Sequence, residues 1–149
     1  MPNYTIKNIR EFDDAAARFG LSPQVEARFG RKELGAEQSG FSYQKLTPDF
    51  RQPFGHKHAS QEEIYVILSG SGQVKIGDDF VDVKQWDSIR VAPATPRAFE
   101  SGRTGSSFSC SAPGRPTTLR LSTTSGPRAR SGQTPVCASS GRSPAPCSG

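Results

Sequence analysis

Residues 56–70, HKHASQEEIYVILSG, carry the strongest indication of the fold in this chain. Its two histidines, His56 and His58, stand two positions apart, and residues with that spacing in an extended strand point to the same side. A polar turn separates them from Glu63, which opens an apolar run that ends at Gly70. This run is rich in β-branched and aromatic residues, as is typical of a buried strand. A hairpin can therefore bring one carboxylate beside two imidazoles, a ligand set that suits a transition metal.

Short strand patterns continue on both sides of this stretch. Apolar residues alternate with polar ones within residues 24–34, and a second strand pattern covers residues 41–46. After Gly70, residues 73–77 and 80–83 form two further runs, joined by a Gly-Asp-Asp turn that is typical of a hairpin. Short strands joined by such turns predict an all-β barrel or sandwich.

The N-terminal residues 1–23 have a different pattern. Asp13 or Asp14 can cap a short helix that contains three alanines, and Gly20 can end it. We expect this segment to be an N-terminal extension that packs outside the barrel.

The spacing H-x-H-x4-E-x6-G in residues 56–70 resembles the first motif of the cupin superfamily. Cupins are small antiparallel β-barrels, also called double-stranded β-helices or jelly rolls, and they often hold a metal. The resemblance implies that residues 24–100 form a cupin-like barrel with His56, His58 and Glu63 as metal ligands. It does not name a reaction, because one fold hosts many activities.

Residues 86–99 resemble the second cupin motif, G-x5-P-x-G-x2-H, with nearly every signature position changed. Trp86, Ala92 and Ala94 replace the two glycines and the proline of the motif. Arg97 stands where the family has its fourth metal ligand, a histidine. An arginine stays protonated and has no lone pair to offer, so it does not ligate a metal.

This change leaves two readings of the site open. In the first, His56, His58 and Glu63 hold a divalent Fe, Mn, Ni or Zn ion with open positions, and Arg97 binds a small anionic molecule such as a carboxylate or phosphate. In the second, the metal is lost and Arg97 pairs with Glu63. The barrel then binds a small ligand without a metal, or binds nothing.

Four other side chains are candidates for ligand contact in the barrel. Tyr43 and Gln44 are neighbours in one strand, and alternation does not decide which of them faces the lumen; a packed aromatic is the alternative for Tyr43. Tyr65, in the apolar strand, and Phe99, in the second motif, complete the set.

Charge is unevenly placed along the 149 residues. Residues 1–100 carry 13 Lys+Arg and 14 Asp+Glu, whereas residues 101–149 carry 6 Arg and no acid. The net charge of +5 therefore belongs to the C-terminal segment, and scattered arginines without interleaved aromatics argue against a nucleic-acid surface. All three cysteines also lie there, with a spacing that fits no zinc motif.

The composition changes sharply after Glu100. Residues 101–149 contain 12 Ser, 7 Gly, 6 Pro and 6 Thr, with one aromatic residue, and we predict a disordered tail. A cupin barrel would nevertheless need a final strand here. Because serine codons mostly begin with T, a shifted reading frame would turn the serine-rich residues 106–111 into an apolar run. We hypothesise that residues 101–149 are a frameshift product; polar residues encoded in that frame of the gene would contradict this.

Two function classes follow from these observations. One is a metal-dependent small-molecule enzyme, for which the resemblance allows oxygenase or isomerase chemistry. The other is a non-catalytic binding or sensing cupin. No nucleophile motif appears, and no catalytic residue is assigned.

The sequence has no long apolar run, so we expect a cytoplasmic protein without a membrane span. A homodimer is compatible with the resemblance.

Overall fold

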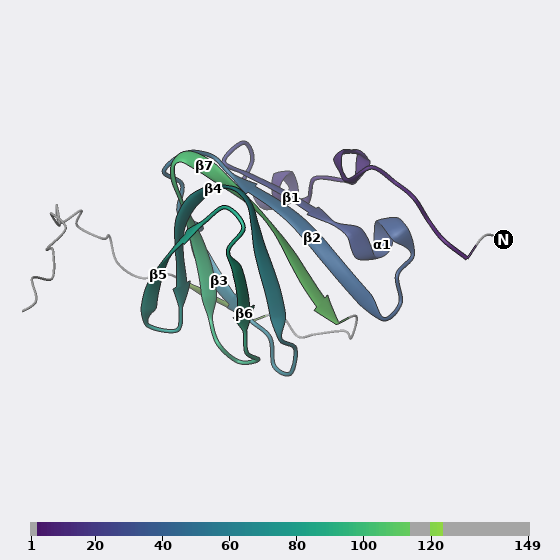
Figure 1. Ribbon diagram of the computed structural model, residues 1–149. Helices are drawn as coiled ribbons and strands as arrows, with labels where there is room; N and C mark the ends of the chain where they lie inside the picture. The colour runs from purple at the N-terminus through teal and green to yellow at the C-terminus, as the bar shows by residue number, and fades with distance from the viewer. Residues whose placement is uncertain (1–2, 114–119, 124–149) are drawn as a thin grey trace, which may run out of the picture.

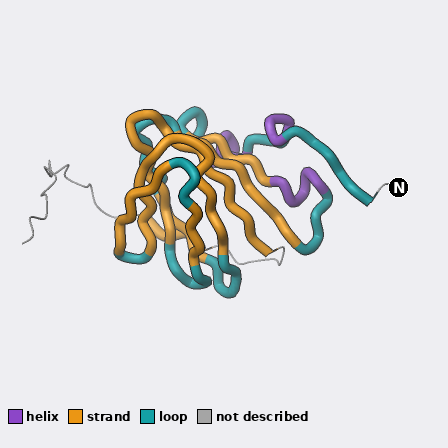
Figure 2. The backbone as a smooth tube through the Cα atoms, in the orientation of Figure 1, coloured by secondary structure: helices purple, strands orange, loops and turns teal. Residues whose placement is uncertain are grey.

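The computed structural model describes residues 3–113 and 120–123 of the chain. Its elements, in order, are two 3-10 turns, η1 (Ile9–Glu11) and η2 (Ala15–Phe19), strand β1 (Val25–Phe29), helix α1 (Gly30–Leu34), and strands β2 (Ser39–Leu46), β3 (Phe54–Lys57), β4 (Glu63–Ile76), β5 (Asp79–Lys84), β6 (Ser88–Val91), β7 (Arg97–Pro113) and β8 (Arg120–Thr123). Strands dominate, and the helical turns lie towards the N-terminus (Figure 2).

Two long strands organise the sheet. β4 pairs with β5, β6 and β7, while β7 also pairs with β2 and β3. β1 lies outside β2, and β8 lies outside β3. Each named pairing within the described residues is antiparallel. Figure 1 shows β4 and β7 bending over at one end, so that the sheet folds back on itself. The predicted all-β barrel is confirmed.

The bend in the long strands explains the glycine of the first motif. The β4–β7 register shifts between Ile67 and Ser69 and again between Gly70 and Gly72. Gly70 has φ +74°, and a Cβ atom added there would lie 2.0 Å from the carbonyl oxygen of Gly105. Only glycine combines this left-handed backbone with so close an approach.

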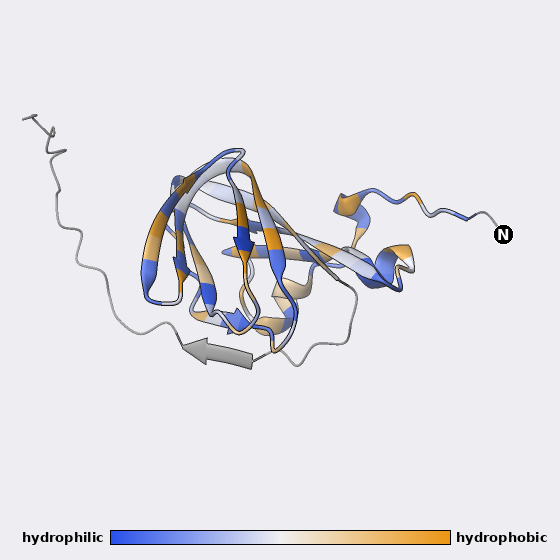
Figure 3. Cartoon of the chain, turned by 60° about the horizontal axis from the view of Figure 1, so that its bottom comes forward, coloured by the Kyte–Doolittle hydropathy of each residue, from blue (hydrophilic) through white to orange (hydrophobic). Residues whose placement is uncertain are grey.

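The core lies between the folded halves of the sheet. Alternation along the strands is visible as bands of hydrophilic and hydrophobic colour in Figure 3. Leu46, Tyr65, Ile67, Val74 and Phe108 are each at most 1% exposed and belong to one cluster. Burying large apolar side chains of this kind is the main stabilising contribution to a small barrel.

The N-terminal prediction holds in part. The expected helix is a 3-10 helix, η2, whose cap is Asp14 and whose end is Gly20 in the left-handed conformation. Residues 24–34 were expected to form one strand, but the strand ends at Phe29 and helix α1 follows. Packing explains the glycine at the start of that helix, because a Cβ atom on Gly30 would lie 2.5 Å from the ring of Phe41.

The predicted boundary at residue 100 is wrong, because it falls inside β7. Residues 106–113 pair with β2 on one side, and residues 106–111 pair with β4 on the other. Composition is a poor guide here, because the hydroxyl of a serine inside a sheet can form a hydrogen bond with a neighbouring segment. Ser107 Oγ lies 2.7 Å from Ser69 Oγ, and Ser101 Oγ bonds the Thr47 carbonyl. Phe108 and Cys110 supply the buried apolar positions.

The rest of the predicted tail falls largely on residues 114–119 and 124–149, which lie outside the described residues. Between these ranges, β8 pairs with β3, with Phe54 opposite Thr123. The frameshift hypothesis stays a hypothesis, since it concerns the gene. Within the described residues, no helix is long and apolar enough to cross a membrane.

Candidate metal centre

Three strands bring the predicted ligands together at one end of the barrel. His56 lies in β3, and His58 follows one residue after that strand ends. Glu63 is the first residue of β4, and Arg97 is the first residue of β7. β3 and β7 pair with His56 opposite Arg97, which fixes these two positions relative to each other. The ring centroids of His56 and His58 lie 5.2 Å apart, so the predicted shared side is confirmed.

Both imidazoles turn their Nε2 atoms towards the same carboxylate. His58 Nε2 lies 2.8 Å from Glu63 Oε1, and His56 Nε2 lies 3.3 Å from Glu63 Oε2. The potential ligand atoms of the three residues all lie within 4.8 Å of one another. Two neutral imidazoles and one carboxylate fit a borderline divalent metal such as Fe, Mn, Ni or Zn. His56, His58 and Glu63 are thus positioned to hold a metal.

One atom of this group stands apart from the hydrogen-bond network. Nδ1 of His58 is buried and has no hydrogen-bond partner among the described residues. Metal-binding histidines usually donate the second ring N–H to a carboxylate or carbonyl, which orients the ring. The orientation of His58 rests instead on its Nε2 contact and on packing.

Arg97 is turned towards Glu63 rather than towards the solvent. Its Nε donates to Glu63 Oε2 at 3.0 Å and to the Tyr65 hydroxyl at 3.0 Å. Nη2 donates to the same carboxylate oxygen, and Nη1 donates to the Thr95 carbonyl at 3.0 Å. The Arg97 side chain is 0% exposed. This geometry gives Arg97 the role of holding Glu63, which is the pairing expected in the second reading of the sequence.

The two oxygens of Glu63 have different surroundings. Oε2 accepts from Arg97 and from the Tyr65 hydroxyl, and His56 lies beside it. Oε1 lies beside His58, on the side away from Arg97 Nε and the Tyr65 hydroxyl. The carboxylate is therefore fixed through one oxygen, which is the kind of outer support that orients a metal-ligating group.

Burial and charge oppose each other in setting the pKa values here. Burial raises the pKa of Glu63, but hydrogen bonds from His56, Tyr65 and Arg97 outweigh it and hold that pKa well below its usual range. Burial also lowers the pKa of His58 despite the nearby carboxylate, which favours the neutral imidazole that a metal requires. Burial lowers the pKa of Arg97, but interactions with Tyr65 and Glu63 outweigh this effect. The net pKa is raised, so the guanidinium stays charged.

The four other predicted contact residues divide into two groups. Gln44 shares the inner face with Leu46 and contacts Gln52, with 3.2 Å between Oε1 and Nε2. Tyr43 points to the opposite face, where Arg10 Nη2 donates to its hydroxyl at 3.3 Å. The interpretation of Tyr43 as a lumen residue is therefore wrong, and its packed alternative is the better description. Strand alternation separates the two neighbours, but only the pairing shows which face is inside.

Tyr65 and Phe99 lie beneath the ligands rather than in an open lumen. Tyr65 is 1% exposed, and its ring packs against Phe99 at 5.0 Å between centroids. Phe108 stacks on Phe99 at 4.2 Å. The hydroxyl of Tyr65 reaches Glu63 and lies 3.4 Å from His56 Nε2. Tyr65 therefore joins the polar site to the aromatic core.

Sequence reasoning missed two residues near the site. Phe108 and Cys110 come from the segment predicted to be disordered, and Cys110 is paired across the sheet with Tyr65. Burial raises the pKa of the Cys110 thiol, and the Glu63 carboxylate raises it further, so the thiol stays protonated. The available signal was the two-residue spacing of Phe108 and Cys110, which places both on one face of a strand.

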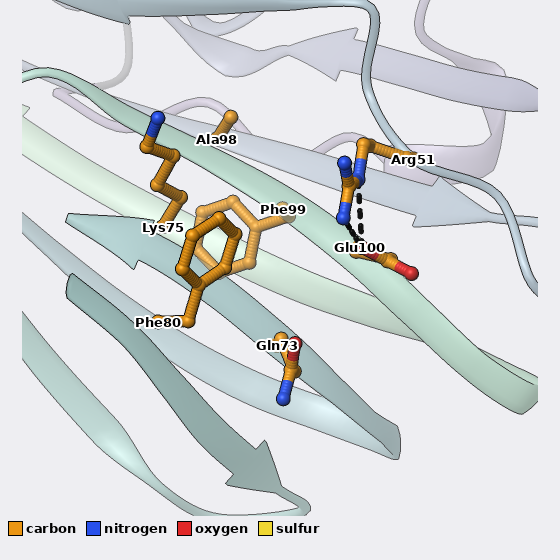
Figure 4. A pocket seen from close by; sticks show the side chains of 7 residues that line it. All are labelled: Arg51, Gln73, Lys75, Phe80, Ala98, Phe99 and Glu100. Atoms are coloured by element: carbon orange, nitrogen blue, oxygen red, sulfur yellow. Dashed lines mark hydrogen bonds and ion pairs between the residues drawn. The ribbon is translucent and has the colours of Figure 1, made fainter. Parts of the chain in front are cut away.

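A small hollow lies elsewhere in the barrel (Figure 4). It has a cavity volume of about 20 Å³, room for about one water molecule, and none of the ligand residues lines it. Its lining residues are Arg51, Gln73, Lys75, Phe80, Ala98, Phe99 and Glu100. The Arg51–Glu100 ion pair at 2.6 Å lies at its edge, separate from the Glu63 pair.

Comparisons with known proteins agree with this fold. The polyketide cyclase RemF from Streptomyces resistomycificus superposes with a TM-score of 0.66 at 19% identity, over 81% of this chain and 87% of the cyclase. A cupin protein, BF4112, from Bacteroides fragilis gives 0.63 at 23% identity, over 76% and 86%. Oxalate decarboxylase from Bacillus subtilis gives 0.61 at 20% identity, over 74% of this chain and 30% of the enzyme.

These matches show that the chain has a cupin fold. At sequence identities this low, the structural matches show the fold alone. In sequence, the chain is 41% identical over 46 residues to the uncharacterized protein MJ1618 from Methanocaldococcus jannaschii. That match spans 31% of this chain and 37% of the relative. No protein-family model matches the chain.

Proposed function

We propose that the protein binds a divalent transition metal through His56, His58 and Glu63, and a small anionic molecule in the barrel beside it. The observation that carries the proposal is the convergence of the three ligand residues, whose donor atoms lie within 4.8 Å of one another. A bound metal would supply Lewis acidity and open positions for an anionic ligand. The chain's own residues provide the rest: Arg97 and Tyr65 orient the carboxylate, and burial keeps His58 neutral.

Charge supports an anionic ligand. The Glu63 carboxylate and the Arg97 guanidinium cancel each other, and the imidazoles are neutral as ligands. A divalent metal would therefore leave an excess of positive charge in a partly buried site. A small carboxylate or phosphate compensates this charge, whereas a neutral ligand does not.

The second candidate is a metal-free cupin that binds or senses a small ligand. It is favoured by the Arg97–Glu63 ion pair, which already neutralises the carboxylate without a metal. In that case ligand binding would stabilise the protein without any metal requirement.

Metal content distinguishes the two candidates. The full chain is purified from metal-supplemented medium and analysed for Fe, Mn, Ni and Zn, alongside His58→Ala and the control Glu62→Gln. Glu62 is the adjacent carboxylate, 44% exposed and paired with Arg90, so its loss leaves the three ligands in place. We expect near-stoichiometric metal in the native chain and the control, and loss in His58→Ala. Metal-free protein that is folded in all three cases would support the second candidate.

Other features remain predictions from the sequence. They are a cytoplasmic location, the absence of nucleic-acid binding and a homodimer.

A further inference from the structure

Arg97 differs from the other arginines with ion pairs in the described residues, because it has no contact with solvent. Its side chain is 0% exposed, and its backbone lies between two strands, with His56 on one side and Ile76 on the other. The guanidinium is held by Glu63, by the Tyr65 hydroxyl and by the Thr95 carbonyl. The guanidinium is therefore held beside Glu63 by three different partners.

The ligand residues are more accessible than this guanidinium. The side chain of His56 is 25% exposed and that of His58 is 11% exposed, against 9% for Glu63. A metal and a small molecule would approach from the histidine side, with Arg97 behind the carboxylate. A single carboxylate would then stand between a fixed monocation and a dication.

The electrostatic consequence follows from burial. Repulsion between like charges is screened in water but persists in a partly buried site. Glu63 carries one negative charge and is already shared with Arg97. A dication bound alone would therefore be poorly compensated, and a second anion would be required to balance it.

We propose that Arg97 couples metal binding to anion binding, so that the metal is held tightly only together with a small carboxylate or similar oxyanion. This inference rests on the proposed metal site. Arg97 acts here as a positioning residue that sets the charge of the site, and it is not itself a metal ligand. Because coupling is reciprocal, the metal raises the affinity for the anion by the same factor.

Free Mn²⁺ measured by electron paramagnetic resonance tests this coupling. The full chain is titrated with Mn²⁺ in chloride-free buffer, with acetate or with acetamide, which has the same shape and no charge. We expect acetate to tighten Mn²⁺ binding by about fivefold or more, within the usual range of coupling between sites. Acetamide should have no such effect.

Two arginine variants locate the effect. Arg97→Gln removes the buried charge and keeps a donor for Glu63; it should bind Mn²⁺ more tightly without acetate and lose most of the acetate effect. Arg90→Gln removes a charge that is 64% exposed and paired with Glu62, and it should behave as the native chain does. If Arg97→Gln does not fold, equal Mn²⁺ binding with acetate and with acetamide in the native chain would still overturn the coupling.

The outcomes separate this inference from the proposed function. Equal Mn²⁺ binding with acetate and acetamide would overturn the coupling and leave the metal site standing. An acetate effect that persists unchanged in Arg97→Gln would also overturn it. Absence of Mn²⁺ binding under every condition, together with metal-free protein in the elemental analysis, would overturn both the coupling and the metal site.

Discussion

Two arginine–glutamate pairs begin at adjacent residues and have opposite environments. Glu62 pairs with Arg90 at 2.7 Å, and these side chains are 44% and 64% exposed. Glu63 pairs with Arg97, and these side chains are 9% and 0% exposed. Glu62 lies just before β4 and faces solvent, whereas Glu63, the first residue of β4, faces the barrel interior. The same pair of residue types is therefore a surface contact in one place and part of the candidate metal centre in the other.

The energetic meaning of the two pairs differs for the same reason. An exposed ion pair gains little, because water already solvates both charges. A buried pair has lost that solvation, so removal of one partner leaves the other charge unpaired in a poor environment. Three substitutions and a change of pH test this difference between the buried and the exposed pair.

The largest effect is expected from removing the buried guanidinium. Arg97→Met should lower the free energy of unfolding by about 3–5 kcal/mol, because Glu63 would remain buried without its partner. Urea denaturation of the full chain without metal measures this loss. Adding Glu63→Gln to Arg97→Met should restore a large part of the stability, since no buried charge is then left unpaired. A loss below about 1 kcal/mol in the single variant would show that the pair behaves like a surface contact.

A smaller loss is expected from Tyr65→Phe. The hydroxyl donates to Glu63 and accepts from Arg97 Nε at 3.0 Å, so its removal takes a hydrogen bond from each charged partner. We expect a loss of about 1–3 kcal/mol in the same denaturation experiment. Phe80→Leu, on the exposed strand β5, provides an aromatic control that should change stability less. An unchanged stability in Tyr65→Phe would remove the hydroxyl from the network.

Acidification should weaken the buried site in two stages. The pKa of His58 is lowered from 6.5 in the folded chain, so the unfolded chain binds more protons as the pH falls below 6.5. The contribution of neutral His58 to the free energy of unfolding is therefore complete above that pH. It declines below that pH, by at most about 1.4 kcal/mol per pH unit for one group. The pKa of Glu63 is lowered from 4.5, so a second decline begins as the pH falls below 4.5.

Denaturation curves at a series of pH values, with a chelator present, measure this dependence. His58→Gln should flatten the first decline and leave the second. Glu62→Gln, which changes an exposed carboxylate, should keep the shape of the native curve. A native chain that gains stability on moving from neutral pH to pH 5.5 or below would contradict the lowered pKa of His58.

The smallest effect is expected at the exposed pair. Arg90→Gln should change the free energy of unfolding by less than about 1 kcal/mol, and high salt should reduce the difference further. Denaturation of both proteins at low and at high salt measures it. A loss as large as that of Arg97→Met would mean that exposure does not separate the two pairs.

The sequence predicted the ligand end of the barrel well, because the relevant signals are local. His56 and His58 share a side through strand alternation, and the apolar run after Glu63 forms a strand. The same local reasoning failed after residue 100. Ser107 and Phe108 pair with residues on β2 and β4, which are remote in sequence. Amino-acid composition does not predict such pairing.

The cupin-like strand pattern and the set of candidate ligands could be predicted from the amino-acid sequence. Spacing and residue type suffice for these, since both depend on neighbours a few residues away. The folded chain was needed to show that Gln44 rather than Tyr43 faces inwards, that β7 continues to Pro113, and that Arg97 is turned towards Glu63. These outcomes depend on strand register and burial, which are fixed only when distant segments pair and exclude water.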